Sequence, residues 1–299
     1  MINLSKKINI AVIGADMRQI HMINKLHEKG YTVYTYGINN DLITEKIIKT
    51  SSLSEAASKG NILICPIPFT KNNKDIAFLD LYEDKNIKHF MECINSNHIL
   101  FAGIIPDYLS THCNRNKIDQ YDFMKMNDVA ILNAIATAEG TIAEAIKRSS
   151  INLHGSNCLV LGFGRCAQVL ANKLQAFNAN VCVAARNKDA CALAVAYGYS
   201  SILLDKLNSE LKNFDFVFNT IPAVVLTKEK LEKLSPYVTI IDIASAPGGI
   251  DYAASEKLNL NASLCLGLPG IYSPKSSGEI LANVIENILI ERSGEFETK

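Results

Sequence analysis

The chain has 299 residues, with 30 acidic and 30 basic side chains, so its formal net charge is zero. It is 48% hydrophobic and 20% charged, an ordinary globular composition, and it is long enough for one large or two medium domains. The balanced charge excludes the basic footprint of a protein that binds nucleic acid or an anionic membrane. We therefore expect a small-molecule or protein partner, without nucleic acid or membrane.

Eight cysteines are spaced singly, without a C-x-x-C pair or a histidine at zinc spacing, so we expect reduced thiols and no metal site. The six histidines form no catalytic or ligand pattern either. The apolar stretch at residues 8–15 is too short for a signal peptide, and no run approaches the roughly 18 apolar residues of a membrane helix. A cytoplasmic location is expected.

The first part of the chain opens with a β-α-β pattern. A buried strand is followed by a turn at residues 14–16 and by a helix at residues 17–29, which ends at Gly30. Apolar runs typical of strands fall at residues 8–13, 32–36, 62–65, 99–102 and 129–132. This alternation indicates an α/β layer, which we expect to be a Rossmann-like substrate and catalytic domain of residues 1–136.

A helix is predicted at residues 137–149, where Thr141 and Glu144 have capping-box spacing, and a polar junction follows at residues 150–156. A stronger alternation then begins. Strands are predicted at residues 158–161, 181–184, 201–204, 216–219, 239–243 and 263–266, and helices at residues 165–177, 188–197, 228–234 and 252–258. Apolar strands alternating with amphipathic helices indicate a doubly wound parallel sheet.

The fold class expected is therefore α/β with two Rossmann-like lobes, of which the C-terminal lobe binds a dinucleotide. That lobe, with the inter-lobe helix, is expected at residues 137–277. The last helix, at residues 278–291, has no strand after it. We expect residues 278–299 to pack back on the N-terminal lobe, with the reaction in a cleft between the lobes.

The sharpest motif is a G-x-G-x-x-A at residues 162–167, between an apolar strand and a helix. The first glycine permits a tight turn, the second lets the backbone approach a pyrophosphate, and the helix N-terminus attracts its charge. The alternative is a glycine turn without a ligand. The cofactor contacts predicted here are Gly162, Phe163, Gly164, Arg165 and Cys166.

At the end of the next strand, an NAD site would carry an acidic residue, but this chain has Ala185, Arg186 and Asn187. An arginine there can pair with a 2′-phosphate, so NADP is favoured and NAD stays possible. A solvated arginine is the alternative interpretation.

Two further loops follow strands of the same sheet and are predicted to contact the cofactor. A proline that merely fixes the first loop is the alternative there. The residues are Thr220, Ile221, Pro222, Ala244 and Ser245.

A third loop, at residues 267–278, precedes the last helix, with Ser276 and Glu279 at capping-box spacing and Lys275 as a cation. It is either an anion-binding corner or simply a loop with a helix cap. The predicted substrate contacts are Pro269, Gly270, Pro274, Ser276 and Ser277, and Lys275 is a predicted catalytic residue.

The N-terminal turn at residues 14–19 lacks the second glycine of a dinucleotide motif. Its Arg18 and Gln19 are predicted to hold a substrate carboxylate, unless they are simply surface residues. Near the inter-lobe helix, Thr137, Glu139 and Thr141 offer hydroxyl donors and a carboxylate base, although helix capping alone would explain the threonines. We assign Thr137 and Glu139 to catalysis and Thr141 to the substrate.

Taken in order, residues 10–19, 137–142, 154–156, 244–249 and 267–275 resemble the A subunits of dipicolinate synthase. This resemblance implies oxidation of dihydrodipicolinate to dipicolinate in the mother cell of a sporulating bacterium, together with a flavoprotein-like B subunit. The second lobe also resembles the NADP domains of shikimate and methylenetetrahydrofolate dehydrogenases, where an arginine after the second strand meets the 2′-phosphate. Asn187 stands where their Asn-Arg-Thr pattern has threonine.

The implied reaction forms an aromatic ring, so the protein must chiefly place the substrate ring against the nicotinamide. A homo-oligomer is also expected. Two alternatives remain at this point. The chain could be a nucleotide-binding regulatory subunit, or it could be an NADP-dependent dehydrogenase of another small carboxylic acid.

Overall fold

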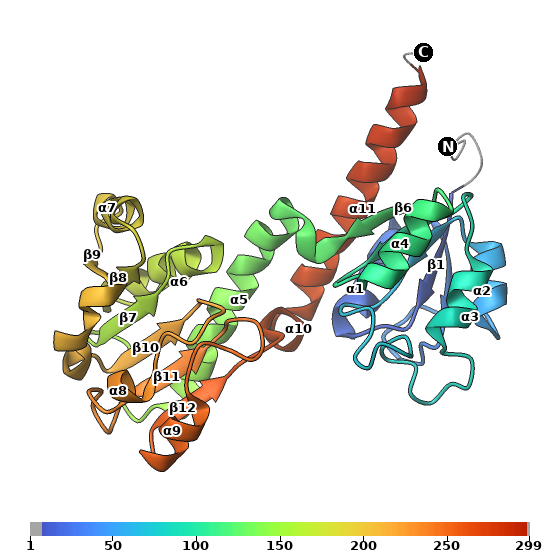
Figure 1. Ribbon diagram of the computed structural model, residues 1–299. Helices are drawn as coiled ribbons and strands as arrows, with labels where there is room; N and C mark the ends of the chain where they lie inside the picture. Colours follow the sequence, from blue (N-terminus) through green and yellow to red (C-terminus); the bar gives the residue numbers. More distant parts are fainter. Residues whose placement is uncertain (1–7, 298–299) are drawn as a thin grey trace. The chain divides into compact units, whose positions relative to one another are not determined.

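The computed structural model describes residues 8–297, which form two compact α/β units (Figure 1). Unit 1 comprises Met1–Ala130 and Pro274–Lys299, and unit 2 comprises Ile131–Ser273. Each unit contains one six-stranded parallel sheet with helices between its strands. The predicted fold class, two Rossmann-like lobes, is confirmed.

In unit 1 the strand order is β3-β2-β1-β4-β5-β6, the doubly wound order of dinucleotide-binding folds. The strands are β1 (Asn9–Ile13), β2 (Thr32–Tyr36), β3 (Ile48–Lys49), β4 (Ile62–Ile64), β5 (Ile99–Ala102) and β6 (Asp119–Asp122). The helices are α1 (Met17–Glu28), α2 (Leu53–Lys59), α3 (Ile87–Cys93), α4 (Asp107–Arg115), the short 3₁₀ turn η1 (Phe123–Lys125) and α11 (Pro274–Glu297).

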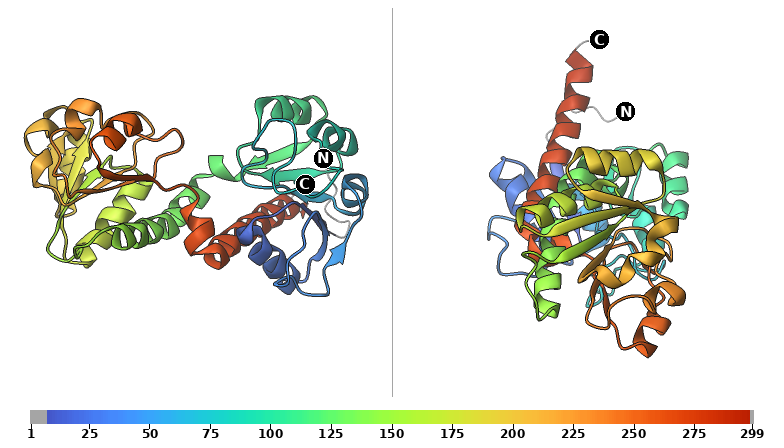
Figure 2. Two further views of the ribbon diagram at one scale, coloured as in Figure 1. Left: turned by 90° about the horizontal axis from the view of Figure 1, so that it is seen from below. Right: turned by 90° about the vertical axis from the view of Figure 1, so that its left-hand side faces the viewer.

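Unit 1 has one apolar core on each face of its sheet, because successive side chains of a strand point to opposite faces. Ile10 and Val12 of β1 belong to one core, and Ala11 and Ile13 belong to the other. Helix α11 lies along α1 on the first face, where Ile285 is fully buried (Figure 2). The C-terminal helix is thus part of the folded core of unit 1.

In unit 2 the strand order is β12-β11-β10-β7-β8-β9, the same topology read from the other edge. The strands are β7 (Asn157–Leu161), β8 (Asn180–Ala185), β9 (Ser200–Leu203), β10 (Phe216–Asn219), β11 (Thr239–Asp242) and β12 (Asn261–Leu264). The helices are α6 (Arg165–Ala176), α7 (Lys188–Ala196), η2 (Leu204–Ser209), η3 (Leu211–Asn213), α8 (Lys228–Leu231), α9 (Tyr252–Lys257) and α10 (Leu268–Tyr272).

The long helix α5 (Asn127–Arg148) spans the division between the units, which falls at residues 130/131. The strand predicted at residues 129–132 is therefore wrong: Val129 is buried while Ile131 and Leu132 are exposed, which is a helical pattern. The helix predicted to begin at residue 137 starts at Asn127 instead. Our boundary at residues 136/137 accordingly differs from the division that the contacts define.

The second division falls at residues 273/274, where α10 ends and α11 begins. The sequence predicted a loop up to residue 277 and a helix from residue 278. Instead, Pro274 is the first residue of α11, a position where proline lacks only an N–H that the helix does not use. Residues 268–272 form α10 rather than a loop.

Within residues 8–297, α5 is the one helix that is long and apolar enough to cross a membrane by length and composition. No such segment was expected from the sequence. Of its most apolar window, 44% is buried inside the structure. Ala138, Ile142 and Ala145 of this helix pack into a core of unit 2.

Candidate functional site

Four predicted segments meet at the carboxyl edge of the sheet in unit 2. They follow β7, β8, β10 and β11, which are parallel neighbours, so their ends share one edge. Strand order reverses between β7 and β10. In open α/β sheets, ligands bind beyond the carboxyl ends of the strands at such a reversal.

The glycine turn after β7 has the geometry that a phosphate site needs. Gly162 has a φ of +96°, and a Cβ there would lie 2.5 Å from Thr220 Oγ1, so the turn requires glycine. Gly164 is the N-cap of α6 and provides no side-chain cap, and a Cβ on it would meet no atom within 4 Å. The N-terminus of α6 is thus open to an anion, and the residues present fit a dinucleotide pyrophosphate.

The side chains of this loop face in different directions. The ring of Phe163 packs 6.1 Å from the rings of Tyr197 and Tyr199, so its side chain supports the fold of the turn. Gln168 Nε2 donates to the carbonyl of Phe163 at 3.0 Å and fixes the turn from the other side. Arg165 is exposed at the start of α6, and burial raises the pKa of the Cys166 thiol.

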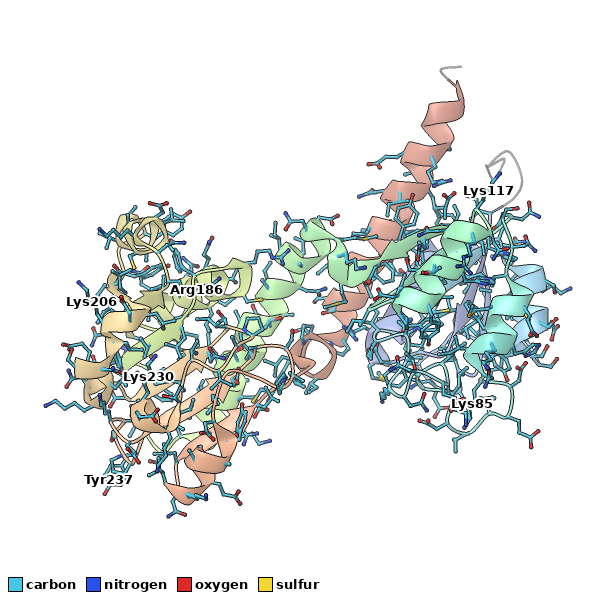
Figure 3. All side chains as sticks on the ribbon, viewed as in Figure 1. Lys85, Lys117, Arg186, Lys206, Lys230 and Tyr237 are labelled. Carbon is cyan, nitrogen blue, oxygen red and sulfur yellow. The ribbon has the colours of Figure 1, made fainter. Side chains whose placement is uncertain are left out.

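The segment after β8 places one cation in solvent. Ala185 is the last residue of β8, and Asn187 Oδ1 accepts from the N–H of Ala190 at 2.8 Å, which caps α7. Arg186 lies between them and is exposed (Figure 3). Among the described residues its guanidinium has no ion-pair partner within the 4.0 Å limit for salt bridges.

The loop after β10 closes over the glycine turn. Thr220 Oγ1 donates to the carbonyl of Leu161 at 2.8 Å, and Ile221 would be 3.1 Å from a Cβ on Gly162. Pro222 is exposed at the tip of this loop. In the neighbouring loop after β11, Ala244 is buried and Ser245 is exposed.

A buried polar network, which sequence reasoning missed, joins these two loops. Asn219 and Asp242, the last residues of β10 and β11, are both fully buried, and Asn219 Nδ2 donates to Asp242 Oδ1 at 2.7 Å. Asp242 also accepts from the N–H groups of Ala244 and Gly249, and from the hydroxyl of Tyr252. The sequence does carry a signal for this network, because two otherwise apolar strands each end in a polar residue, Asn219 and Asp242.

Three residues predicted to contact substrate are buried, which corrects those assignments. Gln19 is fully buried: its Nε2 donates to the carbonyl of Cys65 at 2.9 Å, and its Oε1 accepts from the N–H of Asp16. Thr141 is also fully buried and donates to the carbonyl of Thr137. Ser277 is fully buried in the first turns of α11. Each of these side chains stabilises its own unit.

The predicted capping box of Thr141 and Glu144 is also wrong, because α5 begins at Asn127 and both residues lie in its C-terminal half. Thr137 Oγ1 donates to the carbonyl of Asn133 at 2.9 Å, which is the bond that a threonine makes inside a helix. Glu144 instead accepts from the Tyr272 hydroxyl and from Arg148 Nε. Glu139, the predicted base, is exposed and pairs with Lys173 Nζ at 2.8 Å.

The residues predicted around α10 and α11 are divided between the units. Pro269 and Gly270 lie in α10 of unit 2, while Pro274, Lys275 and Ser276 form the first turn of α11 in unit 1. Lys275 and Ser276 are exposed. The predicted capping box of Ser276 and Glu279 does not form the helix start, because α11 begins at Pro274.

In unit 1, Arg18 is largely covered and is bound to its own turn. Its guanidinium pairs with Asp16, which also caps α1, and donates to the carbonyl of Ile67 at 3.0 Å. The Arg18 side chain is 14% exposed.

The carboxyl edge of the sheet in unit 1 is filled by the chain itself. Leu79 is fully buried, and a Cβ on Gly37, at the end of β2, would overlap its side chain. A Cβ on Gly14, at the end of β1, would lie 2.7 Å from the carbonyl of Ala77. With Asp16 capping α1 as well, unit 1 lacks the open helix N-terminus that unit 2 has.

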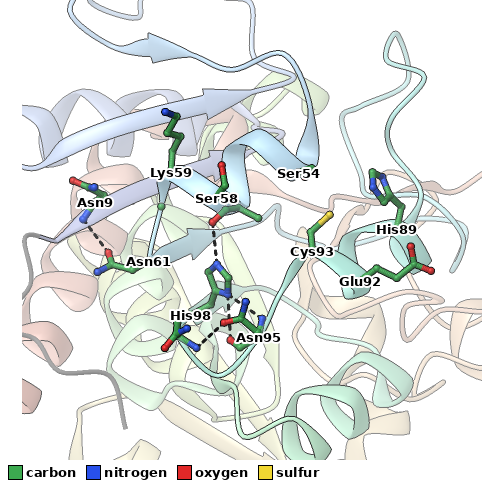
Figure 4. Close-up of a pocket in the computed structure, with 13 residues that line it drawn as sticks. Asn9, Ser54, Ser58, Lys59, Asn61, His89, Glu92, Cys93, Asn95 and His98 are labelled. Atoms are coloured by element: carbon green, nitrogen blue, oxygen red, sulfur yellow. Dashed lines mark hydrogen bonds between the residues drawn. The ribbon is translucent and has the colours of Figure 1, made fainter.

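A separate cavity lies at the opposite, amino edge of the sheet in unit 1 (Figure 4). His98 is buried beneath it and is held by Asn95 and by the carbonyl of Ala57, 2.9 Å from Nε2. Within residues 8–297, no group of three or more histidine, cysteine or acidic residues could hold a metal ion. The ring nitrogens of His98 are thus bonded to the backbone of Asn95 and Ala57, and the second histidine of the lining, His89, is paired with Asp84.

The fold and the open glycine turn define a protein of the two-unit Rossmann, dehydrogenase-like class. Residues 9–124 match the family model of the N-terminal domain of the dipicolinate synthase A subunit, and residues 142–262 match that of shikimate / quinate 5-dehydrogenase. The chain is 33% identical over 290 residues to the dipicolinate synthase A subunit of Bacillus subtilis (strain 168), covering 96% of this chain and 98% of that protein. It belongs to the family of dipicolinate synthase A subunits, and the predicted resemblance is confirmed.

Solved structures agree with this assignment. The dipicolinate synthase A subunit of Bacillus subtilis has a TM-score of 0.87 at 33% identity, covering 97% of this chain and 98% of that one. The corresponding A subunit from Bacillus halodurans has a TM-score of 0.86 at 31% identity, covering 95% and 98%. A transhydrogenase from Sinorhizobium meliloti, 13% identical with a TM-score of 0.67 and 93% coverage of both chains, shares the fold alone.

Proposed function

We propose that this chain is an NADP-linked oxidoreductase that converts dihydrodipicolinate to dipicolinate, pyridine-2,6-dicarboxylate. The observation that carries the proposal is the open glycine turn and uncapped helix N-terminus of unit 2, in a chain that belongs to this family. The oxidation removes a hydride and a proton from the dihydropyridine ring. A bound nicotinamide dinucleotide would supply the hydride acceptor.

The dinucleotide would be held by residues of unit 2. The backbone around Gly162 and Gly164 and the N-terminus of α6 would bind the pyrophosphate. Arg186, exposed and without an ion-pair partner among the described residues, would pair with a 2′-phosphate, which is why we favour NADP over NAD. The exposed edges of the loops at Thr220–Pro222 and Ala244–Ser245 would face the rest of the cofactor.

The dicarboxylate substrate requires cationic or N–H partners. Lys275, exposed in the first turn of α11, and Arg18, partly exposed beside Asp16, are the proposed partners, and Pro269, Gly270, Pro274 and Ser276 are further proposed substrate contacts. Glu139 is the proposed proton acceptor and would have to leave Lys173, just as Thr137 would have to release Asn133. Dipicolinate binding by Arg18→Ala and Lys275→Ala tests the cationic partners, since unchanged affinity in both would reject them.

We further propose that the chain works in the cytoplasm of the mother cell, as a homo-oligomer together with a flavoprotein-like B subunit. The support is its membership of the family of dipicolinate synthase A subunits, whose name denotes one subunit of an enzyme. Turnover of dihydrodipicolinate by the chain alone, and by the chain with the B subunit, separates an independent enzyme from a nucleotide-binding partner subunit. No turnover in either case would contradict the proposed reaction.

The cofactor proposal is tested at Arg186. A guanidinium fork matches a phosphate and gains little from a bare ribose hydroxyl. Arg186→Ala should weaken NADP binding by the value of one charged contact, about 1.5–3 kcal/mol, or roughly ten- to 150-fold, and should barely change NAD binding. Arg186→Asp should invert the preference, because an aspartate accepts from ribose hydroxyls and repels the phosphate.

The measurement is a side-by-side titration of both nucleotides by calorimetry. Lys206→Ala is the control, because Lys206 is an exposed cation on η2 of the same unit (Figure 3). If the unaltered protein binds NAD at least as tightly as NADP, Arg186 is a solvated arginine and the NADP assignment fails.

A further inference from the structure

We propose that Asp242 is the positioning residue that holds the two loops flanking the nicotinamide end of the dinucleotide site. This inference rests on the proposed function of unit 2. Asp242 ends β11 and is fully buried, so its carboxylate cannot touch a ligand itself. Any effect on the cofactor must pass through the groups that Asp242 binds.

The carboxylate is bonded at both oxygens. Oδ1 accepts from Asn219 Nδ2 at 2.7 Å and from the N–H of Ala244 at 3.0 Å. Oδ2 accepts from the N–H of Gly249 at 2.7 Å and from the hydroxyl of Tyr252 at 2.9 Å. A buried carboxylate is stable only when such donors satisfy it, and these four satisfy it from three separate segments.

The donors are the ends of the functional loops. Ala244 and Gly249 begin and end the loop after β11, so a single carboxylate fixes both of its ends. Asn219 carries the same restraint to the loop after β10, because its Oδ1 accepts from the N–H of Ile221 and its Nδ2 also donates to the carbonyl of Ile221. Asn219 is fully buried, and its side-chain groups are committed to these bonds.

Glycine is required where the two loops meet. A Cβ on Gly249 would overlap Asn219 Nδ2 and would lie 2.6 Å from the carbonyl of Ile221. Gly248 has a φ of +89°, and a Cβ there would lie 2.5 Å from Asp242 Oδ2. The backbone therefore wraps the carboxylate closely, and the loops cannot move independently of it.

Tyr252 on α9 is the fourth donor to the Asp242 carboxylate. Burial and the neighbouring Asp242 carboxylate raise the pKa of its hydroxyl, so it stays a donor at neutral pH. Asp242→Asn would replace one carboxylate oxygen by an NH₂ group, which donates and cannot accept. Two of the four groups that donate to Asp242 would then lose their acceptor. Asp242→Asn should therefore release the loops while keeping the size of the side chain.

The test compares two ligands of the same site. Adenosine 2′,5′-bisphosphate carries only the half expected at the glycine turn and Arg186, whereas NADP also carries the nicotinamide half. Asp242→Asn should weaken NADP binding roughly ten- to hundredfold and should change adenosine 2′,5′-bisphosphate binding by less than about twofold. Unchanged NADP binding, or equal weakening of both ligands, would overturn the proposal.

Asp215→Asn is the matched control. Asp215 lies at the amino edge of the same sheet, where its Oδ2 accepts from the N–H of Asn157 at 2.8 Å. The same chemical change there should leave both affinities within about twofold. If Asp242→Asn does not fold, Tyr252→Phe removes one donor and leaves three, and it should shift NADP affinity in the same direction by about threefold, with no shift counting against the proposal.

Hydrogen exchange separates this inference from the proposed function. In the ligand-free protein, Asp242→Asn should speed exchange of the Ala244 and Gly249 amides by at least about tenfold, relative to the amides of β7. Equal rates in the variant and the unaltered protein would show that Asp242 does not hold the loops. If the unaltered protein binds neither NADP nor NAD, the proposed function fails, and the exchange rates still decide the role of Asp242.

Discussion

Glu144 is a carboxylate about one turn before the end of α5, and it is only 9% exposed. It accepts from the hydroxyl of Tyr272 on α10 and from Arg148 Nε, at 2.7 Å in the second case. Chiefly the Tyr272 bond, and then Arg148, lower its pKa below the ordinary 4.5. A Cβ on Gly140, one turn earlier, would lie 2.9 Å from the Tyr272 ring, so glycine allows this close approach of α10 to α5.

Because the pKa of Glu144 is lowered by folding, its ionised form stabilises the protein above the ordinary value of 4.5, and this contribution is lost as the pH falls through the lowered pKa. Glu144→Gln should cost about 1–2 kcal/mol in the free energy of unfolding at pH 7, and less as the pH falls through the lowered pKa of Glu144. Urea unfolding between pH 7 and 3 measures this. Glu139→Gln, an exposed pair partner on the same helix, is the control, and an equal pH dependence in both variants would contradict the prediction.

At the residue scale, sequence reasoning worked where the backbone has a local signature. The glycine turn at Gly162 and Gly164 could be predicted because glycines at this spacing are the residues that the backbone conformation of the turn requires. Gln19 and Thr141 were misassigned because a polar side chain near a candidate site points inward as readily as outward. Asp242 was missed because a buried carboxylate is recognised by its donors, which lie at Asn219, Ala244, Gly249 and Tyr252.

At the element scale, the long connection between β4 and α3 decides what unit 1 can bind. Its residues near Leu79 cover the ends of β1 and β2, against Gly14 and Gly37. Lys71 lies 4.4 Å over the ring of Phe78 in the same connection. A dinucleotide at the carboxyl edge of unit 1 would need this space, so the packing of the connection supports the proposal that the dinucleotide binds to unit 2.

Leu79→Ala tests this packing, because Leu79 is fully buried whereas Leu81 is 96% exposed on the same connection. The cavity left by Leu79→Ala should cost about 2–5 kcal/mol in the free energy of unfolding. The same substitution at Leu81 should cost less than about 0.5 kcal/mol. Equilibrium unfolding in urea distinguishes them, and similar values for the two variants would show that the connection does not pack on the strand ends.

The elements that could be predicted are those with strong apolar periodicity, such as β1, α1, β7 and α6. β6 was missed because its sequence, Asp119 to Asp122, is polar and only partly buried at a sheet edge. The run at residues 129–132 was read as a strand because a short apolar run fits either structure; its place in a 22-residue helix is set by the longer pattern of α5.

At the scale of the whole molecule, the last helix of the chain, α11, belongs to unit 1, the unit that the first part of the chain forms. Helix α11 buries Leu281, Ile285 and Leu289 in the core that α1 and β1 begin. Two ion pairs hold it further: Lys29 with Glu286, and Arg292 with Asp119. Residues at opposite ends of the sequence therefore complete one core, a pairing that no local sequence signal specifies.

Gly278 is a point of close approach between α11 and α1, since a Cβ there would overlap the carbonyl of Arg18 and would lie 3.0 Å from the N atom of Met22. Both neighbours are backbone atoms of α1, so they cannot yield without moving that helix. Gly278→Ala should therefore cost about 1–3 kcal/mol as an overpacked contact, despite the higher helix propensity of alanine.

The loss should be confined to unit 1. Hydrogen exchange should show lower protection for the amides of α1 in Gly278→Ala, unchanged protection for those of β7, and NADP affinity within about twofold of the unaltered protein. Asn283→Ala, an exposed position on the same helix, is the control and should leave all three unchanged. Full protection of the α1 amides in Gly278→Ala would mean that α11 can shift along unit 1 without destabilising it. The contact at Gly278 would then not fix the position of α11 against α1.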